Sequence, residues 1–300
     1  MEHLSLYVYD FIDYCKFRKT LNDKTIKAYS TDLKQFFDCT AMLDKTSISN
    51  YISDLHKKYK PKTVKRKLAT LKAFVYYLLI EDVIEANPFD KIETSFREPT
   101  ILPKTIPFNI INYMLCEAYT EYEISEGFSK RICLRNIAVM EMLFATGARV
   151  SEICSLTPKT VDLENHRIKI FGKGSRERII QIENADVLKI LSDYYSVFQT
   201  DIQSCGYFFV NKIHKRLSEQ SVREIIEKYA KRTGDNIHIT PHMFRHSFAT
   251  LLLEEDVDIR YIQKILGHSS ITTTQIYTHV AMAKQKEILS AKHPRNKIRI

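Results

Sequence analysis

The sequence predicts a mostly α-helical protein of two domains, with a small antiparallel β-sheet in the second. Its 300 residues exceed the usual size of one domain, and its 44% hydrophobic content can fill real cores. Apolar residues recur at helical spacing over most of the chain. Pro99, Pro103 and Pro107 indicate an extended linker. We therefore expect a helical domain at residues 1–97, a linker at 98–106 and a second domain at 107–300.

The first domain is expected to hold four or five helices. Its first helix carries apolar residues at helical spacing from Leu4 to Cys15. A second begins near Asn22 or Asp23, either of which can cap it, and a third begins near Ser47. Pro61 suits the first turn of a fourth helix, because proline is tolerated there.

The second domain is expected to mix helices with one β-hairpin. Two short strand-like runs, His166 to Phe171 and Arg178 to Ile182, flank the turn Gly172-Lys173-Gly174-Ser175. Gly147 is placed to end the helix before them. The helices are expected at residues 108–120, 132–145, 184–197, 218–232, 242–254, 258–266 and 281–290.

Charge and cysteine usage narrow the function classes. A net charge of +9 favours a polyanionic partner, although many basic proteins have none. The six cysteines form no Cys-x-x-Cys pair and no zinc-finger spacing with His, which indicates buried thiols in a reducing cytoplasm and no metal. The N-terminus has acids where a signal peptide needs bases, and the run Ala73 to Ile80 is too short to cross a bilayer. We expect a soluble, cytoplasmic protein.

One stretch of sixteen residues is strongly basic and contains no acid. A solvated helical face is the usual explanation of such a run, but here the acids that normally accompany it at i to i+4 are missing. We predict phosphate contacts, with the solvated face as the alternative. The basic residues are Lys57, Lys58, Lys60, Lys62, Lys65, Arg66, Lys67 and Lys72.

Two segments place cations where structure alone does not demand them. Arg149 follows a helix-ending glycine and lies at the mouth of the next helix, where the helix dipole disfavours positive charge. The alternative is a surface arginine paired with Glu152. His242 and Arg245 are three residues apart and share one helical face, which is also common on surface helices.

A third segment holds His268 and, nine residues later, Tyr277. A lone tyrosine is more often a core residue than a nucleophile, so the combination of segments decides. Cleavage of a phosphodiester without metal needs a nucleophile, cations around the nonbridging oxygens and a proton donor for the departing hydroxyl. The three segments together with Lys173 on the hairpin turn supply that set, and no acidic cluster indicates a two-metal site.

The order Arg149, Lys173, His242-x-x-Arg245, His268, Tyr277 resembles the signature of the tyrosine recombinases, or phage integrase family. TGARVSE, GKGSRER, HMFRHSFATLLLE and LGHSSITTTQIYTHV are similar to the Xer-type and the integron or transposon branches. One departure is Met-Phe between the His and the Arg, where the family commonly has a Leu. The resemblance implies a SAM-like helical core-binding domain and a mainly α catalytic domain with a small sheet, forming a C-shaped clamp on DNA.

The resemblance also implies the roles of the reacting groups. Tyr277 would attack the scissile phosphate and form a 3′-phosphotyrosyl link, while Lys173 would protonate the 5′-hydroxyl leaving group. His242 would assist proton transfer at the tyrosine. Because the covalent link stores the phosphodiester energy, no cofactor, ATP or metal is required.

The phosphate itself would be held by three cationic residues, namely Arg149, Arg245 and His268. Their charge counts most while the phosphorane develops. Glu152 would orient Arg149 from behind. These roles are carried over position by position from the family's motif.

By the same resemblance, the partner is double-stranded DNA with specific recombination sites, bound by a homotetramer that joins two sites. The segment 281–300, with apolar anchors Met282, Ile288 and Leu289, would reach into a neighbouring subunit. The same anchors could instead pack on their own domain. Integration, excision, inversion and resolution of DNA, for a chromosome or a mobile element, all remain open.

Two other functions are compatible with parts of the sequence. A type IB topoisomerase uses similar chemistry, but it has a larger N-terminal region and does not explain TGARVSE. A non-catalytic, sequence-specific DNA-binding protein explains the charge and the helices equally well. It gives no reason for the positions of Lys173 and Tyr277.

Overall fold

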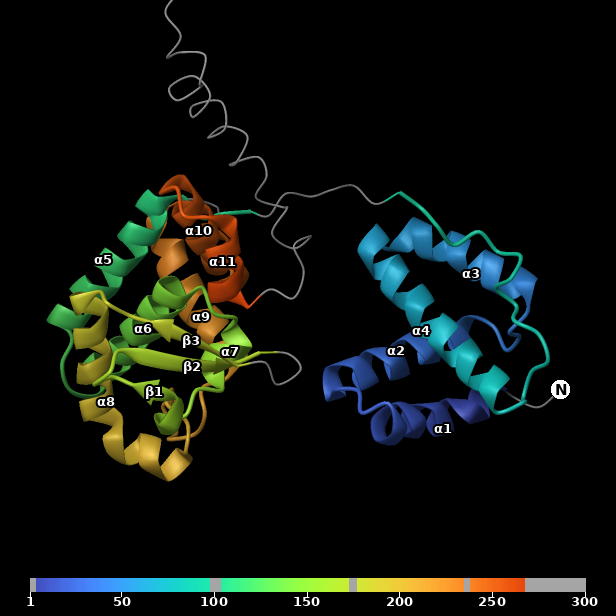
Figure 1. Cartoon of the computed structure of the whole chain (residues 1–300), viewed down its shortest axis with the longest axis horizontal. Helices are drawn as coiled ribbons and strands as arrows, with labels where there is room; N and C mark the ends of the chain where they lie inside the picture. Colours follow the sequence, from blue (N-terminus) through green and yellow to red (C-terminus); the bar gives the residue numbers. More distant parts are fainter. Residues whose placement is uncertain (1–3, 98–103, 173–176, 235–237, 268–300) are drawn as a thin grey trace, which may run out of the picture. The chain divides into compact units, whose positions relative to one another are not determined.

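The computed structural model describes residues 4–97, 104–172, 177–234 and 238–267. The chain divides into two compact units, Met1–Ile101 and Leu102–Ile300, which are described separately below (Figure 1). Both units are built mainly from helices, and the described part of the second adds a small antiparallel sheet. The predicted mostly α fold class is confirmed.

All regular secondary structure in the described part of the first unit is helical. Asn22 caps its second helix by accepting a hydrogen bond from Thr25 N at 2.9 Å, as the sequence predicts. Pro61 occupies the first turn of its last helix. The elements are η1 (Leu4–Leu6), α1 (Tyr7–Asp13), η2 (Tyr14–Arg18), α2 (Asp23–Cys39), α3 (Lys45–Lys58) and α4 (Pro61–Ile80).

The α3 helix begins at Lys45, slightly earlier than the expected start near Ser47. The reason is its cap residue, Asp44, whose carboxylate accepts a hydrogen bond from Ser47 N at 2.8 Å. A cap of this kind satisfies one of the free N–H groups in the first turn. The helix therefore starts directly after the aspartate.

Aromatic side chains fill the core of the first unit. The Phe11 ring meets the Phe74 ring edge-on at 5.4 Å between centroids, and Phe36 meets Tyr51 in the same way at 5.0 Å. These contacts join α1 to α4 and α2 to α3. Such pairs add about 0.5–1.5 kcal/mol each beyond the apolar area they bury.

The second unit places a three-stranded antiparallel sheet beside a group of helices (Figure 1). The predicted hairpin is confirmed, since Ile168 of β2 pairs with Ile180 of β3. The elements are α5 (Phe108–Ile124), α6 (Gly127–Thr146), α7 (Val150–Cys154), η3 (Pro158–Thr160), β1 (Val161–Asp162), β2 (Arg167–Phe171), β3 (Glu177–Gln181), α8 (Ala185–Cys205), α9 (Glu219–Ala230), η4 (Lys231–Thr233), α10 (Pro241–Glu254) and α11 (Ile259–Leu266).

Several boundaries differ from the sequence-based expectation. The α8 helix continues to Cys205 instead of ending near residue 197, because Phe198 and Ile202 extend its buried stripe. The elements α7 and β1 are absent from the prediction, since five and two residues are too few to show a period. The hairpin turn at residues 173–176 and the helix expected at 281–290 lie outside the described residues.

The α6 helix runs through the core of the second unit. Its side chains from Cys133 to Leu143 are buried on every side, and it packs against α5, α8 and α10. A helix that is buried all round holds its end in a fixed place. The turn after α6 is therefore anchored in the core.

Gly147 ends α6 in the left-handed conformation, with φ of 57°. An added Cβ there would lie 2.5 Å from Phe248 Cδ1. We expect Gly147→Ala to lower the free energy of unfolding by about 2–4 kcal/mol, from backbone strain plus overpacking. Urea titration of the purified chain would measure this effect.

Gly206→Ala is the matched control for that experiment. Gly206 also ends a helix with positive φ, at 76°, but a Cβ there meets no atom within 4 Å. It should cost only the backbone strain, about 1–2 kcal/mol. Equal destabilisation in the two variants would show that the contact with Phe248 is unimportant.

Candidate active site

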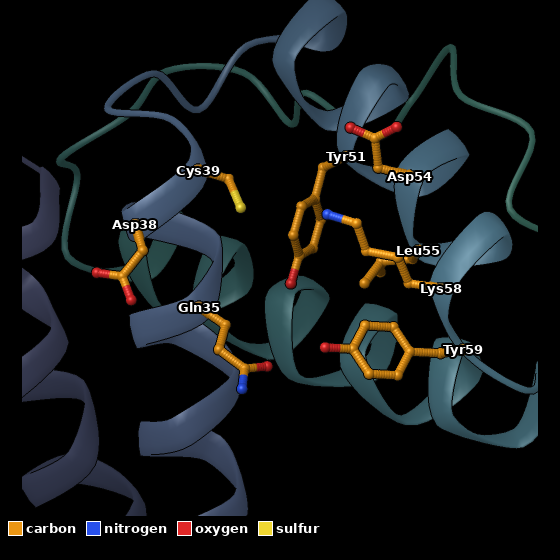
Figure 2. Close-up of a pocket in the computed structure, with 8 residues that line it drawn as sticks. All are labelled: Gln35, Asp38, Cys39, Tyr51, Asp54, Leu55, Lys58 and Tyr59. Atoms are coloured by element: carbon orange, nitrogen blue, oxygen red, sulfur yellow. The ribbon is translucent and has the colours of Figure 1, made fainter.

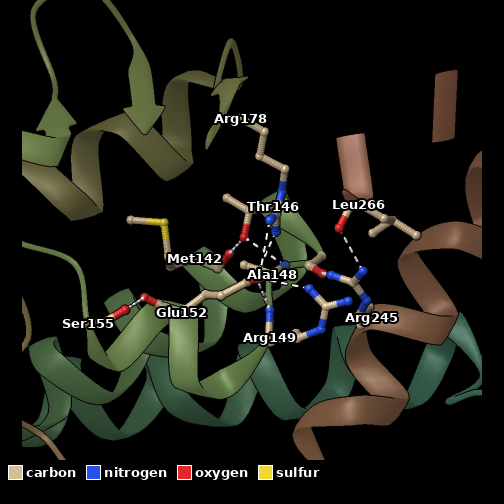
Figure 3. A network of polar contacts seen from close by, with 10 residues as sticks. Met142, Thr146, Ala148, Arg149, Glu152, Ser155, Arg178, Arg245 and Leu266 are labelled. Carbon is tan, nitrogen blue, oxygen red and sulfur yellow. Dashed lines mark hydrogen bonds and ion pairs between the residues drawn. The ribbon is translucent and has the colours of Figure 1, made fainter. Parts of the chain in front are cut away.

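The turn between α6 and α7 carries Arg149 (Figure 3). Thr146 is buried there, donates to Met142 O at 2.6 Å and accepts from Ala148 N at 3.2 Å. With Gly147 in the left-handed conformation, these bonds fix the backbone that leads into Arg149. The Arg149 side chain stays 35% exposed.

Glu152 lies beneath Arg149 and is only 5% exposed. Its Oε2 accepts from Arg149 N and its Oε1 accepts from Arg149 Nη1, both at 2.8 Å. Burial alone would raise the pKa of Glu152, but hydrogen bonds from Arg178 and Arg149 outweigh it and hold the pKa below its ordinary value. The carboxylate is therefore ionised at neutral pH and fixes one edge of the Arg149 guanidinium.

Arg178 of β3 completes this ion-pair group, and sequence reasoning missed it. Its Nη2 donates to Glu152 Oε2 at 2.6 Å and its Nη1 to Glu152 Oε1 at 3.2 Å. The available signal is the alternation of β3, where Arg178 shares a face with Ile180 and Ile182. An arginine on the inward face of a strand indicates a buried acidic partner.

Arg245 of α10 is 3% exposed and reaches the same turn. Its Nη1 donates to Gly147 O at 2.8 Å, and its Nη2 donates to Leu266 O at 2.7 Å. These carbonyls lie two residues before Arg149 and two residues before position 268. Arg245 thus joins the ends of α6 and α11, as Figure 3 shows.

His242 lies one turn before Arg245, near the start of α10, and is exposed. His246, one turn after His242 on the same helix, has its ring centroid 6.0 Å from that of His242. Burial, followed by the nearby His242 and Arg245, lowers the pKa of His246 to about 4. His246 is consequently neutral at physiological pH.

The structure brings together Arg149, Glu152 and Arg245 of the predicted site, with His242 on the same helix as Arg245. Lys173, His268 and Tyr277 lie outside the described residues. Their assigned roles stay predictions. The described ranges end directly before two of them, at Gly172 and at Gly267.

The basic run of the first unit is less uniform than its sequence indicates. Lys67 is buried, at 4% exposure, and donates to Asp32 Oδ1 at 2.9 Å and to Gln35. Arg66 also pairs with Asp32. Both partners come from α2, far away in sequence, so the run is not without acidic partners. The buried Lys67 ammonium consequently links α4 to α2 through these hydrogen bonds and is not available to a phosphate.

Other members of the run also have partners. Lys57 pairs with Asp54 at 3.0 Å, one turn earlier, and Lys72 Nζ donates to Thr94 Oγ1 at 2.6 Å. Lys58 lines a pocket of about 250 Å³ together with Tyr51 and other residues of α2 and α3 (Figure 2). Phosphate contacts by the exposed members of the run stay a prediction.

The six cysteines form no disulfide bonds. The sequence predicts that they are buried, but only three of them are. Cys15, Cys133 and Cys154 are buried, whereas Cys39 and Cys116 are exposed. Among the described residues, no group of three or more His, Cys, Asp or Glu side chains could hold a metal ion. No helix in the same part of the chain is long and apolar enough to cross a membrane.

Comparison with known proteins gives matches along nearly the whole chain. The model of the Phage integrase family matches residues 120–284, and that of the Phage integrase, N-terminal SAM-like domain, matches residues 8–82. A tyrosine recombinase of Agathobacter rectalis is 50% identical, with 98% of each chain covered. Tyrosine recombinase XerC of Thermodesulfovibrio yellowstonii is 35% identical, with 99% of each covered.

Among solved structures, the XerH site-specific recombinase bound to a palindromic difH substrate has the same fold, with a TM-score of 0.74 at 21% identity. The match covers 95% of this chain and 84% of that one. The family model and the relatives together define an enzyme that cleaves and rejoins DNA. The chain belongs to the phage integrase family and is a tyrosine recombinase.

Proposed function

We propose that this recombinase exchanges strands between specific DNA sites through a 3′-phosphotyrosyl link to Tyr277, inside the cell and without a cofactor. The observation that carries the proposal is the anchored pair Arg149 and Arg245. The Arg149 guanidinium donates a hydrogen bond to Glu152 of α7. The Arg245 guanidinium donates hydrogen bonds to the backbone carbonyls of Gly147 and Leu266. Cations fixed before the reaction stabilise developing charge without reorganisation, which is the largest contribution in many enzymes.

In the proposed reaction, the Tyr277 hydroxyl oxygen attacks the phosphorus and the bond to the 5′-oxygen breaks. His242 takes part in proton transfer at the tyrosine, and Lys173 gives a proton to the departing 5′-oxygen. One phosphodiester replaces another, so the step needs no external energy. A second 5′-hydroxyl attacking the phosphotyrosine reverses these events and releases the enzyme.

Arg149, Arg245 and His268 would surround the nonbridging oxygens in this proposal. The partial exposure of Arg149 supports contact with a phosphate, while Glu152 behind it fixes the direction in which the guanidinium points. Arg245 uses bonds to two carbonyls to hold its plane. Its burial places it deeper than Arg149.

The test is a nicked suicide duplex that carries the recombination site. Cleavage next to the nick releases a short fragment and traps the enzyme on the DNA. A band that stays shifted on a denaturing gel, and that disappears after protease treatment, is the expected result. A chain that binds the site tightly but never forms this band would be a DNA-binding protein only.

Lys60 and Lys62 are the members of the basic run best placed for phosphate contacts. Both are exposed and lie at the start of α4, where the helix dipole disfavours a positive charge. Positive charges at this end therefore do not stabilise the helix. An approaching phosphate would instead meet two ammonium groups close to the positive end of the helix dipole.

We therefore expect the double variant Lys60→Ala, Lys62→Ala to weaken binding to all DNA sequences. The slope of log affinity against log salt should become shallower by about 0.9 for each phosphate that is no longer neutralised. Fluorescence anisotropy at several salt concentrations measures the slope. The control, Lys27→Ala with Lys34→Ala, removes two exposed lysines of the same unit that lie inside α2, away from a helix start. An equal change in both double variants would mean that only net charge matters.

We further propose a tetramer on two DNA sites, linked by the segment 281–300 of each subunit. A groove of about 560 Å³ in the second unit supports an acceptor site, since apolar side chains such as Phe144, Leu251 and Leu252 line it. The segment offers Met282 and Ile288 as apolar anchors.

Charge also favours this match. The groove is lined by three carboxylates, Glu141, Asp186 and Glu255. Burial raises the pKa of Glu141 above its ordinary value, against the hydrogen bond from Tyr119 that lowers it, and the nearby Asp186 adds to the rise. A cation bound beside Glu141 would favour its ionised form. The segment 281–300 holds six Lys and Arg residues and one Glu.

We expect deletion of residues 281–300 to leave binding to one site intact but to remove cooperative assembly and strand exchange. Gel shifts on one-site and two-site DNA, together with a recombination assay, separate these steps. A truncated chain that recombines two sites at the wild-type rate would contradict the proposal, and packing within one subunit would then explain the anchors.

A further inference from the structure

We propose that Arg178 is a positioning residue that keeps Glu152 ionised and fixed in place, and through Glu152 sets the direction of the Arg149 side chain. This role rests on the proposed function, because Arg149 is taken to hold the phosphate. Arg178 lies on strand β3 of the hairpin, whereas Arg149 lies at the α6–α7 turn and Arg245 lies on α10.

The Glu152 carboxylate is fully occupied by two arginines. Each of its oxygens accepts one bond from Arg149 and one from Arg178, four bonds in all. The bonds from Arg178 come as a two-pronged pair, which is the strongest geometry for an arginine and a carboxylate. These four hydrogen bonds prevent the Glu152 carboxylate from rotating about its Cγ–Cδ bond. The two oxygens that accept from Arg149 therefore keep a fixed position.

Arg178 also changes the balance of charge at this place. Glu152 is almost fully buried and would, with Arg149 alone, cancel the positive charge of that side chain. Arg178, which is 9% exposed, supplies a second cation to the same carboxylate. The three groups together carry one net positive charge, and the partly exposed Arg149 is the member able to present it to a phosphate.

Gly267, which directly precedes His268, packs closely on the Arg178 side chain. A Cβ on Gly267 would lie 3.1 Å from Arg178 Cδ and 3.1 Å from its Nη1, and the glycine has φ of 66°. The Arg178 side chain thus contacts Glu152 of α7 and Gly267, while its backbone belongs to strand β3 of the hairpin.

Two other roles for Arg178 predict different results. A direct phosphate contact would weaken DNA binding, but the small exposure of the side chain argues against it. A purely structural ion pair would lower stability and leave the pH dependence of cleavage unchanged. A positioning role predicts a slower cleavage step, with unchanged binding and a new dependence on pH.

The direction of that pH dependence follows from the groups around Glu152. Burial raises the pKa of Glu152, and the hydrogen bond from Arg178 is the first of the contacts that lower it. Without Arg178 the pKa of Glu152 must rise. As pH falls through the raised pKa, Glu152 gains a proton and releases Arg149, so cleavage by the variant should decline toward acidic pH.

The first experiment compares Arg178→Met with wild type in single-turnover formation of the DNA adduct. At neutral pH we expect a rate lower by about 100-fold, as for a misplaced catalytic group, with unchanged affinity for the site. Arg178→Lys keeps the charge and should recover part of the rate. Arg167→Ala, which removes an exposed arginine of the neighbouring strand β2, should leave the rate unchanged.

The second experiment asks whether Arg178 acts through Glu152. In a Glu152→Gln background, adding Arg178→Met should slow cleavage by less than about threefold, because the intermediary is already gone. Fully multiplicative effects would overturn the proposal. A variant that unfolds is recognised by its melting curve, and Arg178→Lys then provides the comparison.

A third measurement does not depend on activity. Carbon NMR titration of the Glu152 carboxyl should show a higher pKa in Arg178→Met than in wild type. An unchanged pKa would overturn the inference even if cleavage slowed. If wild type itself formed no adduct, the proposed function would fail, while the titration would still decide whether Arg178 controls Glu152.

Discussion

Replacing Tyr277 with Phe is expected to abolish adduct formation, by more than about 10⁴-fold, while binding to the recombination site stays within a few-fold of wild type. The substitution removes only the hydroxyl that attacks the phosphate, and the remaining groups of a catalytic unit do not replace a missing nucleophile. Denaturing gels of the trapped complex measure the adduct, and gel shifts measure binding.

Tyr261→Phe is the matched control, because Tyr261 is an exposed tyrosine on α11. It should form the adduct at the wild-type rate. A Tyr277→Phe variant that still became linked to DNA would show that another residue is the nucleophile, and mapping the linked peptide would identify it.

The second large effect is expected for Lys173→Ala, with a cleavage rate lower by about 10²–10⁴-fold because a positioned acid is removed. A substrate with sulfur in place of the bridging 5′-oxygen needs no proton to leave. That substrate should restore most of the rate of Lys173→Ala. Quenched-flow cleavage of the oxygen and sulfur substrates measures the rescue.

Arg149→Ala is the comparison for that rescue. A better leaving group does not replace a cation at the nonbridging oxygens, so the sulfur substrate should help this variant far less. Equal rescue of the two variants would remove the assignment of Lys173 as the general acid. Rescue of neither would place the acid elsewhere.

The first unit shows where sequence reasoning about charge fails. Composition identifies the basic run, yet Lys67 is buried against Asp32 and Gln35. Asp32 lies 35 positions earlier, so no local pattern could reveal the pair. Local rules for charge pairs cover only neighbours at i to i+4.

The sequence by itself determined the fold class, the hairpin and the order of the chemical motifs. Helical and alternating periods are local properties, because each follows from which side of an element is buried. Gly147 as the end of α6 follows in the same way, since only glycine readily adopts the left-handed conformation.

Only the tertiary structure decided how the charged groups are joined. Arg178 of β3 meets Glu152 at the start of α7, and Arg245 of α10 meets carbonyls at the ends of α6 and α11. These contacts link residues that are far apart in the chain. The energy of a buried charge depends on every partner that packing brings within hydrogen-bond reach, and that set is defined only when the core has formed.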